Sequence, residues 1–435
     1  MSSRSVSALK PLGLGVHSLS YHLSMSALPV HPTVLSFEDA RRVVEEHTAR
    51  IVASGAEFVE LLAAAGRVLA ETVVADRDLP PFPRSTRDGY AVRSTDLGQL
   101  PTTLDVIGEI KAGEKLSKIP ANIGIGEAVS IMTGAPVPDG ADAVVMVECS
   151  SQEGQRVEIT RGVMPGENVV PRGAEARQGS VLLDRNLRLT DAGIALAASV
   201  GKSRLQVYQR PRVAVLTTGD EIVSVDATPG PTQIRNSNSY SLAVQILKAG
   251  GQPVLLPVAP DERQALQQLI ELGLKSDLLL LTGGVSIGRY DLVEQVLAEM
   301  QAEFFFTGAK IQPGRPVVFG RLGHRFFFGL PGNPVSTMVT FELFARPMLE
   351  ALAGMSPRKL MFVHARLKSE IRVKLGLTRF LPAILSGEFE NSEVELVAWQ
   401  GSGDVAATAR ANCYVVIPPD WDLIAPGEFV AVMMR

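Results

Sequence analysis

Cysteine is nearly absent from this 435-residue sequence, which contains only Cys149 and Cys413. The two residues lie far apart, and neither stands at the spacing of a metal-binding motif. The sequence therefore argues against a disulfide framework and against a zinc site. Such sparse use of cysteine favours a reducing compartment, and we expect the protein in the cytoplasm.

Net charge and long apolar runs are also lacking. The formal net charge is only −4, whereas a protein that binds nucleic acid usually carries a basic surplus. No apolar run is long enough to cross a bilayer. Residues 1–33 are rich in serine and lack the continuous apolar core of a signal peptide. We expect a disordered tail there, with Met25 as an alternative start that would leave residues 1–24 untranslated.

Apolar residues are plentiful. They make up 46% of the chain and charged residues 20%, a balance typical of a globular protein with sizeable cores. A chain of this length predicts about three domains rather than one. We therefore expect several separately packed units.

The segment 277–300, DLLLLTGGVSIGRYDLVEQVLAEM, combines a strand, a glycine turn and a helix. The apolar run 278–281 is typical of a strand buried on both faces, and apolar residues recur with the helical period after 292. Backbone amides at such a turn attract anions, and Asp291 at the helix start invites a bridging divalent cation. The alternative is that Gly283 and Gly284 only turn the chain and Asp291 only caps a helix.

Residues 211–356 alternate strands and helices, which predicts a mostly parallel sheet with helices on both faces. Ligands then bind at the carboxyl ends of the strands. Four acids follow successive strands and are expected at that one rim: Asp220, Glu221, Asp261 and Asp291. Any one of them is harmless in a solvated loop. Together, beside a glycine turn, they indicate handling of a cation and of phosphate.

Two further segments lead to the same rim. QPGRP, residues 312–316, supplies the guanidinium of Arg315, which suits phosphate but equally a salt bridge to a nearby acid. GLPGNPVS, residues 329–336, opens a helix expected over 335–352. Its turn is a binding loop or simply a rigid helix start, and it comprises Pro331, Gly332, Asn333 and Pro334.

The remaining chain predicts three more units. Residues 34–84 and 173–210 are expected to form one helical domain, with a helix capped by Ser36, another over 56–69 and a third over 190–199. Short strands between glycines and prolines in 85–172 predict an inserted small β domain. Residues 357–435 return to β-branched segments and predict a small closed or partly closed barrel.

Three loops outside the α/β segment carry polar residues. The loop STRDGYAV contains Asp88, the loop MTGAPVPDGAD contains Thr133, and QGSGD places Ser402 between glycines. Asp-Gly and Gly-Pro sequences are ordinary turn chemistry, so each loop has a purely structural explanation as well.

In chain order, the motifs STRDGYAV, MTGAPVPDGADAVVMVE, PRGAE, TTGDEI, IRNSNSYSL, TGGVSIGRYD, QPGRP, GLPGNPVS and QGSGD together resemble the MoeA and gephyrin E-domain family, the molybdopterin molybdenumtransferases. The resemblance runs from about Ser36 to the C-terminus. It implies a MogA-like α/β domain, a helical dimerisation domain interrupted by a β domain, and a C-terminal barrel.

The resemblance also implies a reaction. The family inserts molybdate into adenylylated molybdopterin and releases AMP with Mg²⁺, in a homodimer whose cleft is shared between subunits. Transient contacts with the adenylyltransferase and with recipient molybdoenzymes are implied too, but none with nucleic acid or membrane. The catalytic residues implied by the resemblance are Asp88, Thr133, Glu221, Asp261 and Asp291. The implied metal ligands are Glu175, Glu221, Asp261 and Asp291. The implied substrate-binding residues are Thr282, Gly283, Gly284, Ser286, Lys310, Arg315, Pro331, Gly332, Asn333, Pro334 and Ser402.

Several positions depart from the family pattern. Lysines are common in the family where this chain has Gln312 and, a few residues earlier, Gly308, near which Lys310 is the closest cation. Glu175 and Asn236 stand where aspartates are usual, and an arginine expected near Pro382 is displaced to Arg379. Two rivals stand beside this interpretation: a non-catalytic, gephyrin-like dimeric scaffold, and the related molybdopterin adenylyltransferase, which shares the α/β domain. Retention of the acids favours a transferase over the scaffold, and the inserted β domain and the terminal barrel favour insertion over adenylylation.

Overall fold

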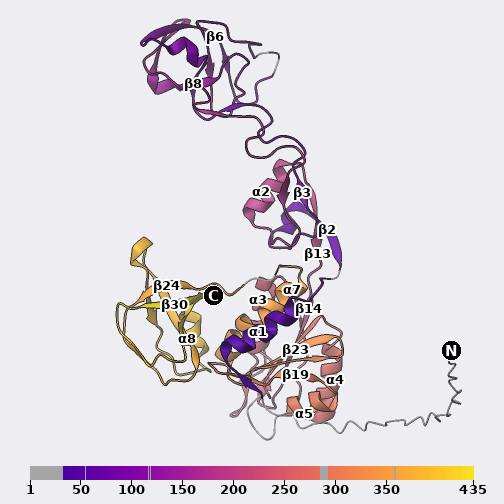
Figure 1. The fold of residues 1–435 in the computed structure, drawn as a ribbon. Helices are drawn as coiled ribbons and strands as arrows, with labels where there is room; N and C mark the ends of the chain where they lie inside the picture. The colour runs from indigo at the N-terminus through magenta and orange to yellow at the C-terminus, as the bar shows by residue number, and fades with distance from the viewer. Residues whose placement is uncertain (1–32, 54, 116, 118, 285–291, 357–358) are drawn as a thin grey trace, which may run out of the picture.

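The computed structural model describes residues 33–53, 55–115, 117, 119–284, 292–356 and 359–435. These residues form an elongated molecule (Figure 1). The α/β domain and the C-terminal barrel lie together at one end, and the sheet that carries β6 and β8 lies at the other. A smaller unit that contains α2 lies between them.

The α/β domain is built on a six-stranded sheet. Its spatial order is β17 (Gln252–Leu255), β14 (Arg212–Thr217), β18 (Leu278–Thr282), β23 (Arg325–Leu330), β22 (Val318–Leu322) and β19 (Glu303–Phe306). The first four strands are parallel, and β22 and β19 are antiparallel to their neighbours. Every side chain of β18 is buried, as the unbroken apolar run predicted.

Helices cover both faces of this sheet. One face carries α1 (Phe37–Thr48), α3 (Asn238–Ala249) and a continuous helix formed by α6 (Pro334–Thr340), the π-helical turn η5 (Phe341–Ala345) and α7 (Arg346–Leu352). The other face carries α4 (Arg263–Gly273) and α5 (Leu292–Glu299). Leu280 packs on the first side and Leu281 on the second, because successive strand side chains point to opposite faces.

The position of α1 differs from the sequence prediction. Ser36 caps α1 as expected, its Oγ accepting a hydrogen bond from the backbone N–H of Asp39 at 3.0 Å. However, Ala40 and Val44 are fully buried in the core of the α/β domain. The helix therefore packs with residues 212–352 rather than with residues 173–210.

The C-terminal region forms a closed barrel. Its strands are β24 (Val363–Leu367), β26 (Thr378–Ser386), β27 (Glu393–Leu396), β28 (Cys413–Ile417) and β30 (Phe429–Met434). The barrel closes because β26 pairs with both β27 and β28. The short strand β21 (Ile311–Gln312), which belongs to the α/β segment, pairs in parallel with β26 and joins the two domains.

The inserted β domain contains a second six-stranded sheet. Its order is β8 (Ala143–Met146), β5 (Gly89–Val92), β7 (Glu127–Ile131), β6 (Thr102–Ile110), β10 (Arg156–Ile159) and β9 (Ser150–Glu153). Residues of β10 alternate between exposed and buried, as expected for a strand with one face on a core.

The unit between the insert and the α/β domain is mostly built from strand pairs. They are β2 (Ala56–Glu60) with β13 (Arg204–Tyr208), β3 (Val73–Val74) with β12 (Val181–Leu183), and β4 (Arg84–Ser85) with β11 (Val169–Val170). The predicted helix over 190–199 is α2 (Asp191–Ser199). The helix predicted over 56–69 is wrong: β2 is followed there by the 3₁₀ helix η1 (Leu61–Ala64). Pairing with β13 satisfies the backbone of β2 and overrides the local pattern.

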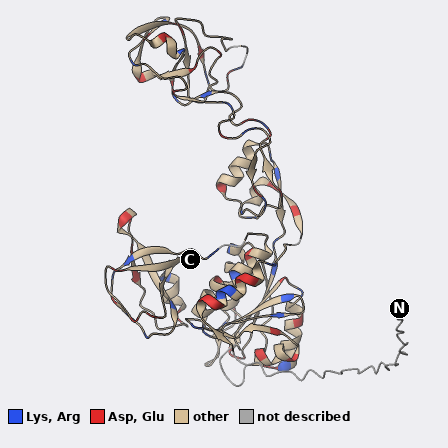
Figure 2. Ribbon diagram, viewed as in Figure 1, with Lys and Arg blue, Asp and Glu red and all other residues tan. Residues whose placement is uncertain are grey.

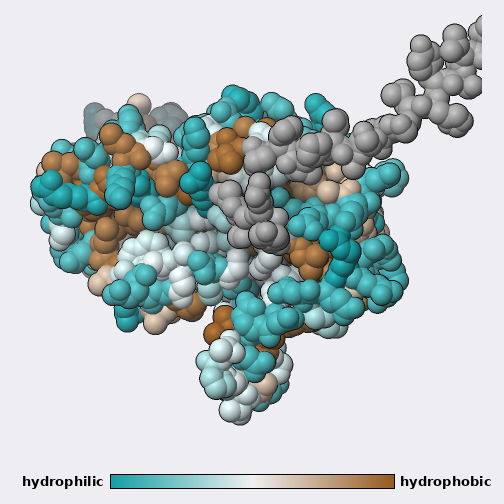
Figure 3. Space-filling view, turned by 90° about the horizontal axis from the view of Figure 1, so that it is seen from below, coloured by the Kyte–Doolittle hydropathy of each residue, from teal (hydrophilic) through white to brown (hydrophobic). Residues whose placement is uncertain are grey.

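The other described elements are short: β1 (Val34–Leu35), β15 (Ile222–Val223), β16 (Ile234–Arg235), β20 (Gly308–Ala309), β25 (Ile371–Arg372), β29 (Leu423–Ile424), α8 (Val405–Arg410), η2 (Ser94–Leu97), η4 (Val147–Cys149) and η6 (Phe389–Asn391). No helix among the described residues is both long and apolar enough to span a membrane. Acidic and basic residues are interspersed over all units (Figure 2). Apolar and polar areas alternate on the face formed by the α/β domain and the barrel (Figure 3).

Candidate active site

A cavity of about 390 Å³ lies at the carboxyl ends of β14, β18 and β23. The first residues of α3 and the turn that begins α6 form its other walls, so two helix N-termini face it. Its polar and turn residues are Thr217, Thr218, Glu221, Arg235, Asn236, Ser237, Asn238, Thr282, Gly283, Gly284, Pro331, Gly332, Asn333 and Pro334. The predicted rim of the sheet is therefore where a ligand-sized space is found.

The glycine turn approaches its neighbours too closely for a side chain. Gly283 has φ +91°, and a Cβ on it would lie 2.4 Å from the backbone oxygen of Thr218. Gly284 has φ +60°, and its Cβ would lie 2.8 Å from Val293 Cγ2. Both glycines line the cavity with bare backbone. Two other predicted residues of this loop, Ser286 and Asp291, lie outside the described residues.

Asn238 is the most constrained polar side chain at this site. Its Nδ2 donates to Thr282 Oγ1 at 2.9 Å and to the carbonyl oxygen of Gly332 at 2.7 Å. Thr282 Oγ1 donates in turn to the carbonyl of Pro331 at 3.2 Å. Because both positions facing Nδ2 act as acceptors, the amide has one orientation. Its buried Oδ1 accepts no hydrogen bond from the part of the chain that the structure describes.

Thr218 provides a second buried polar atom without a partner. Its hydroxyl oxygen makes no hydrogen bond to any residue that the structure describes, and Thr218 is only 3% exposed. Buried polar atoms are normally satisfied, so two such atoms in one cavity make it a candidate ligand site. Both residues lie in motifs that the sequence shows plainly, but no sequence pattern gave Thr218 or Asn238 a role. The sequence signal that could have identified them is their position: Thr218 directly follows β14, and Asn238 begins α3.

Three carboxylates lie near one another beside this cavity, and one of them, Glu221, lines it. The backbone N–H of Asp261 donates to Asp220 Oδ1 at 3.1 Å. Partial burial raises the pKa of the Asp261 carboxyl, and the neighbouring charges of Asp220 and Glu221 raise it further. Within the described residues, however, no group of three or more His, Cys, Asp or Glu side chains is arranged to hold a metal ion.

The remaining predicted acids lie elsewhere. The backbone N–H and hydroxyl of Thr133 donate to Asp88 Oδ1 at 2.6 and 2.8 Å, and these bonds lower the pKa of Asp88. This pair lies in the inserted β domain, at the far end of the molecule from the cavity. Glu175 pairs with Arg84 at 2.7 Å beside β4, so the chain does not bring it together with Glu221 and Asp261.

The cations near QPGRP are arranged differently from the prediction. Lys310 and Arg315 are exposed and form no ion pair with a described carboxylate. Arg379 is 5% exposed, and its Nε donates to Gln312 Oε1 at 2.9 Å. Arg379 thus lies against Gln312. Ser402 reaches the site from the barrel, accepting a hydrogen bond from Asn333 Nδ2 at 2.8 Å.

A cavity at the rim of a parallel sheet, with unsatisfied polar atoms, bare glycine backbone and grouped carboxylates, defines a ligand-binding α/β protein. Residues 214–351 match the family described as a probable molybdopterin binding domain. Residues 35–201 match the MoeA N-terminal region, domains I and II, and residues 364–434 match the MoeA C-terminal region, domain IV. The chain belongs to the MoeA family.

Curated relatives and solved structures agree with these matches. A protein from Nostoc sp. named molybdopterin molybdenumtransferase is 34% identical, over 87% of this chain and 88% of its own. One of the same name from Haemophilus influenzae is 32% identical, over 86% and 93%. A crystal structure of a molybdopterin biosynthesis MoeA protein from Pyrococcus horikoshii OT3 is 28% identical with a TM-score of 0.76, covering 92% of this chain and 100% of that one.

Proposed function

We propose that this protein is a molybdopterin molybdenumtransferase that acts on adenylylated molybdopterin. The observation that carries the proposal is the fixed amide of Asn238, whose buried Oδ1 requires a hydrogen-bond donor from a ligand. A pterin ring offers several N–H donors, and a pyrophosphate suits the adjacent glycine backbone and helix N-termini. Relatives of the same name support the assignment.

In the proposed reaction, water adds across the P–O–P bond of the substrate and releases AMP, leaving a phosphate on molybdopterin. One molybdate oxygen leaves as water with the two dithiolene protons, and two Mo–S bonds form. Asn238 and Thr218 would orient the pterin, while the amides of Gly283 and Gly284 would hold the phosphates. Positioning of this kind makes the attack effectively unimolecular.

The carboxylates near the cavity fit a magnesium ion. Mg²⁺ is usually held by one or two carboxylates together with substrate phosphates, so Glu221 and Asp261 suffice as protein ligands. The pKa of Asp261 is raised first by partial burial and then by repulsion from Asp220 and Glu221, and a bound cation would relieve that repulsion. Bound there, Mg²⁺ would neutralise the phosphates and acidify a water molecule. Asp291 remains a further proposed ligand, whereas Glu175 would have to come from a second subunit.

The assay that tests this function uses purified protein, adenylylated molybdopterin, molybdate and Mg²⁺. We expect stoichiometric AMP release and a product that activates an apo-molybdoenzyme. Thr218→Val removes a hydroxyl that has no hydrogen-bond partner among the described residues, so the midpoint of thermal unfolding should not fall. The KM for adenylylated molybdopterin should rise about tenfold, which corresponds to about 1.4 kcal/mol of binding free energy. No AMP release by the wild-type protein, or an unchanged KM in the variant, would contradict the assignment.

We also propose a homodimer in which each cleft uses residues of both chains. In one chain, Asp88 and Thr133 lie at the far end from the cavity, so they reach a substrate only in a second copy. Asp88→Asn and Asp261→Asn should each inactivate the homodimer. Mixing the two variants and allowing subunit exchange should restore up to about a quarter of wild-type activity per dimer, since one cleft in half of the dimers is intact. No recovery despite proven exchange would show that the clefts are not shared.

A further inference from the structure

A second cavity of about 390 Å³ lies where the α/β domain meets the barrel. The middle of α3 contributes Gln245 and Lys248, and the continuous helix contributes Glu342 and Arg346. Tyr414 of β28 and Arg435 close it from the barrel side. None of the residues lining the first cavity lines this one.

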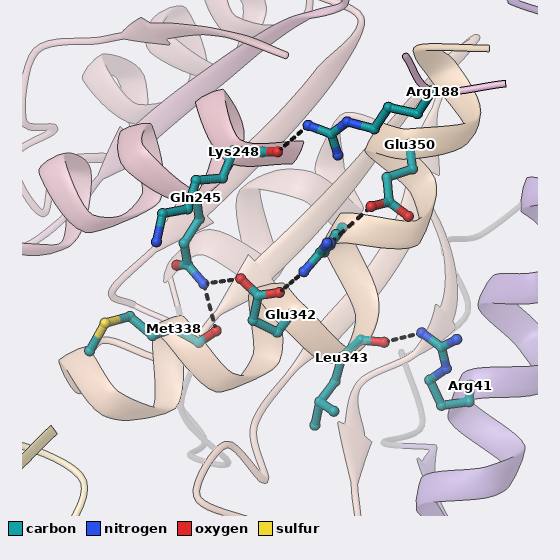
Figure 4. A network of polar contacts seen from close by, with 9 residues as sticks. Arg41, Arg188, Gln245, Lys248, Met338, Glu342, Leu343 and Glu350 are labelled. Carbon is teal, nitrogen blue, oxygen red and sulfur yellow. Dashed lines mark hydrogen bonds and ion pairs between the residues drawn. The ribbon is translucent and has the colours of Figure 1, made fainter. Parts of the chain in front are cut away.

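Gln245 gives this cavity an unsatisfied acceptor. Its Nε2 donates to the carbonyl oxygen of Met338 at 3.0 Å and to Glu342 Oε1 at 2.8 Å. Both partners are acceptors only, so the amide cannot be turned around. Figure 4 shows the nitrogen facing Glu342 and Met338, with the oxygen on the other side of the amide. That oxygen is buried without a hydrogen bond, so it requires a donor that the described residues do not provide.

Cations dominate the other polar groups. Arg346 is held by two carboxylates, its Nη1 donating to Glu342 at 2.8 Å and its Nε to Glu350 at 2.9 Å. Lys248 and Arg435, in contrast, form no ion pair with any carboxylate of the described residues. The Arg435 guanidinium lies over the ring of Tyr414, 5.6 Å from its centroid, and Nη1 donates to two backbone carbonyls. Two positive charges at the rim therefore remain available to an anion.

Much of the remaining wall is apolar. Val244 and Ala249 of α3 and Met338 of α6 face the cavity together with the Tyr414 ring. Tyr414 is 1% exposed, and burial raises its pKa to about 12, so the phenol adds no negative charge at neutral pH. An occupant must therefore combine an anionic group, a hydrogen-bond donor and a flat or apolar body.

We propose that this second cavity is a binding site for a nucleoside monophosphate. The phosphate would lie between Lys248 and Arg435, a hydroxyl or amino donor would reach Gln245 Oε1, and the base would lie against the apolar wall. Arginine and lysine form strong, charge-assisted hydrogen bonds with phosphate oxygens. AMP is the natural member of the class to test, because the proposed reaction releases it.

Two helices connect this site to the first cavity. Asn238, at the start of α3, lines the first cavity, and Gln245 lies seven residues further along the same helix, roughly 10 Å away. Asn333 precedes α6 at the first cavity, and Glu342 follows in η5, where the helix widens into a π turn. Such turns occur often at functional sites. An occupant that shifts α3 against this helix would change the affinity of the first cavity, and the effect is reciprocal.

The test is a calorimetric titration of the full-length protein with AMP, without molybdopterin or molybdate. We expect two sites per chain. Gln245→Leu and Lys248→Met should each weaken AMP binding at the second cavity at least tenfold. Thr218→Val, which changes the first cavity, should leave AMP binding at the second cavity unchanged. Gln267→Leu changes an exposed glutamine on α4 that donates to Glu271; it is the matched control and should leave both sites unchanged. Sulfate, which carries no donor, should compete at least tenfold more weakly than AMP.

Each alternative outcome is distinct. A single site per chain, or unchanged AMP affinity in both Gln245→Leu and Lys248→Met, would overturn the proposal. A change of oligomeric state in Gln245→Leu with unchanged AMP binding would also overturn it, because the cavity would then be a contact between copies of the chain. If Gln245→Leu does not fold, its midpoint of thermal unfolding shows this. The AMP affinity of Lys248→Met, which changes an exposed side chain, then decides the outcome. Failure to release AMP from substrate, with two sites intact, would reject only the proposed reaction.

Discussion

Asp261→Asn is expected to lower Mg²⁺-dependent AMP release by at least 100-fold. The substitution keeps the size of the side chain and the backbone hydrogen bond to Asp220, but it removes the negative charge that the proposed metal site requires. Loss of one group that stabilises transition-state charge, such as a single oxyanion-hole donor, typically lowers kcat by about 10²–10³-fold. The measurement is single-turnover AMP release at saturating substrate, with Mg²⁺ varied.

Stability separates this effect from misfolding. The pKa of Asp261 is raised, so this carboxyl contributes stability below its ordinary pKa and loses that contribution as pH rises through the raised value. At neutral pH without metal, Asp261→Asn should therefore unfold at the same temperature as the wild type or higher. Mg²⁺ should raise the wild-type midpoint more than that of the variant. Asp226→Asn, an exposed acid on a neighbouring loop, serves as the control. Equal AMP release by the two variants would remove Asp261 from the metal site.

Gly283→Ala is expected to abolish turnover and to destabilise the α/β domain by at least 2 kcal/mol. The residue has φ +91°, and a methyl group would be forced to within 2.4 Å of the Thr218 carbonyl oxygen, which belongs to the backbone and cannot rotate away. The free-energy cost of the positive φ adds to the cost of the backbone shift that the methyl group forces. Since the turn displays the amides proposed to hold the pyrophosphate, substrate binding should be lost with the geometry. Urea unfolding and equilibrium substrate binding measure the two effects.

A glycine in the same domain isolates the cause. Gly323, in the turn between β22 and β23, has φ +60°, and a methyl group added to it would meet no atom within 4 Å among the described residues. Gly323→Ala should therefore show only the cost of a positive φ, about 1 kcal/mol, with normal turnover. If the two alanine variants were equally stable and equally active, close approach at Gly283 would have no role.

Much of the fold follows from local sequence patterns. The buried run at 278–281, the helical period after 292 and the β-branched segments after 357 each predicted the element that is present. The segment 56–69 failed because its partner strand β13 lies about 150 residues away, and pairing at that distance leaves no local signal. The position of α1 failed for the same reason: a helix period shows which face is apolar, not which core receives it.

The candidate site was predicted in outline but not in its polar detail. Strand ends and glycines located the cavity, and Glu221, Thr282 and Asn333 line it as expected. Thr218 and Asn238 were missed because an unsatisfied hydrogen-bonding atom is a property of three-dimensional packing alone. Arg379 is similar, since its contact with Gln312 depends on the pairing of β21 with β26.

The packing of α1 against the α/β sheet has a consequence for synthesis of the chain. The helix ends at residue 48, whereas the last strand of the sheet it covers ends near residue 330, roughly 280 residues later. At 5–20 residues per second, ribosomes take on the order of 15–60 s to make the intervening chain. During that interval the apolar stripe of the nascent helix has no native surface to cover, and it must emerge beside an insert and a connecting unit that can already fold. A chaperone acting early in translation would be expected to engage this protein at its first helix.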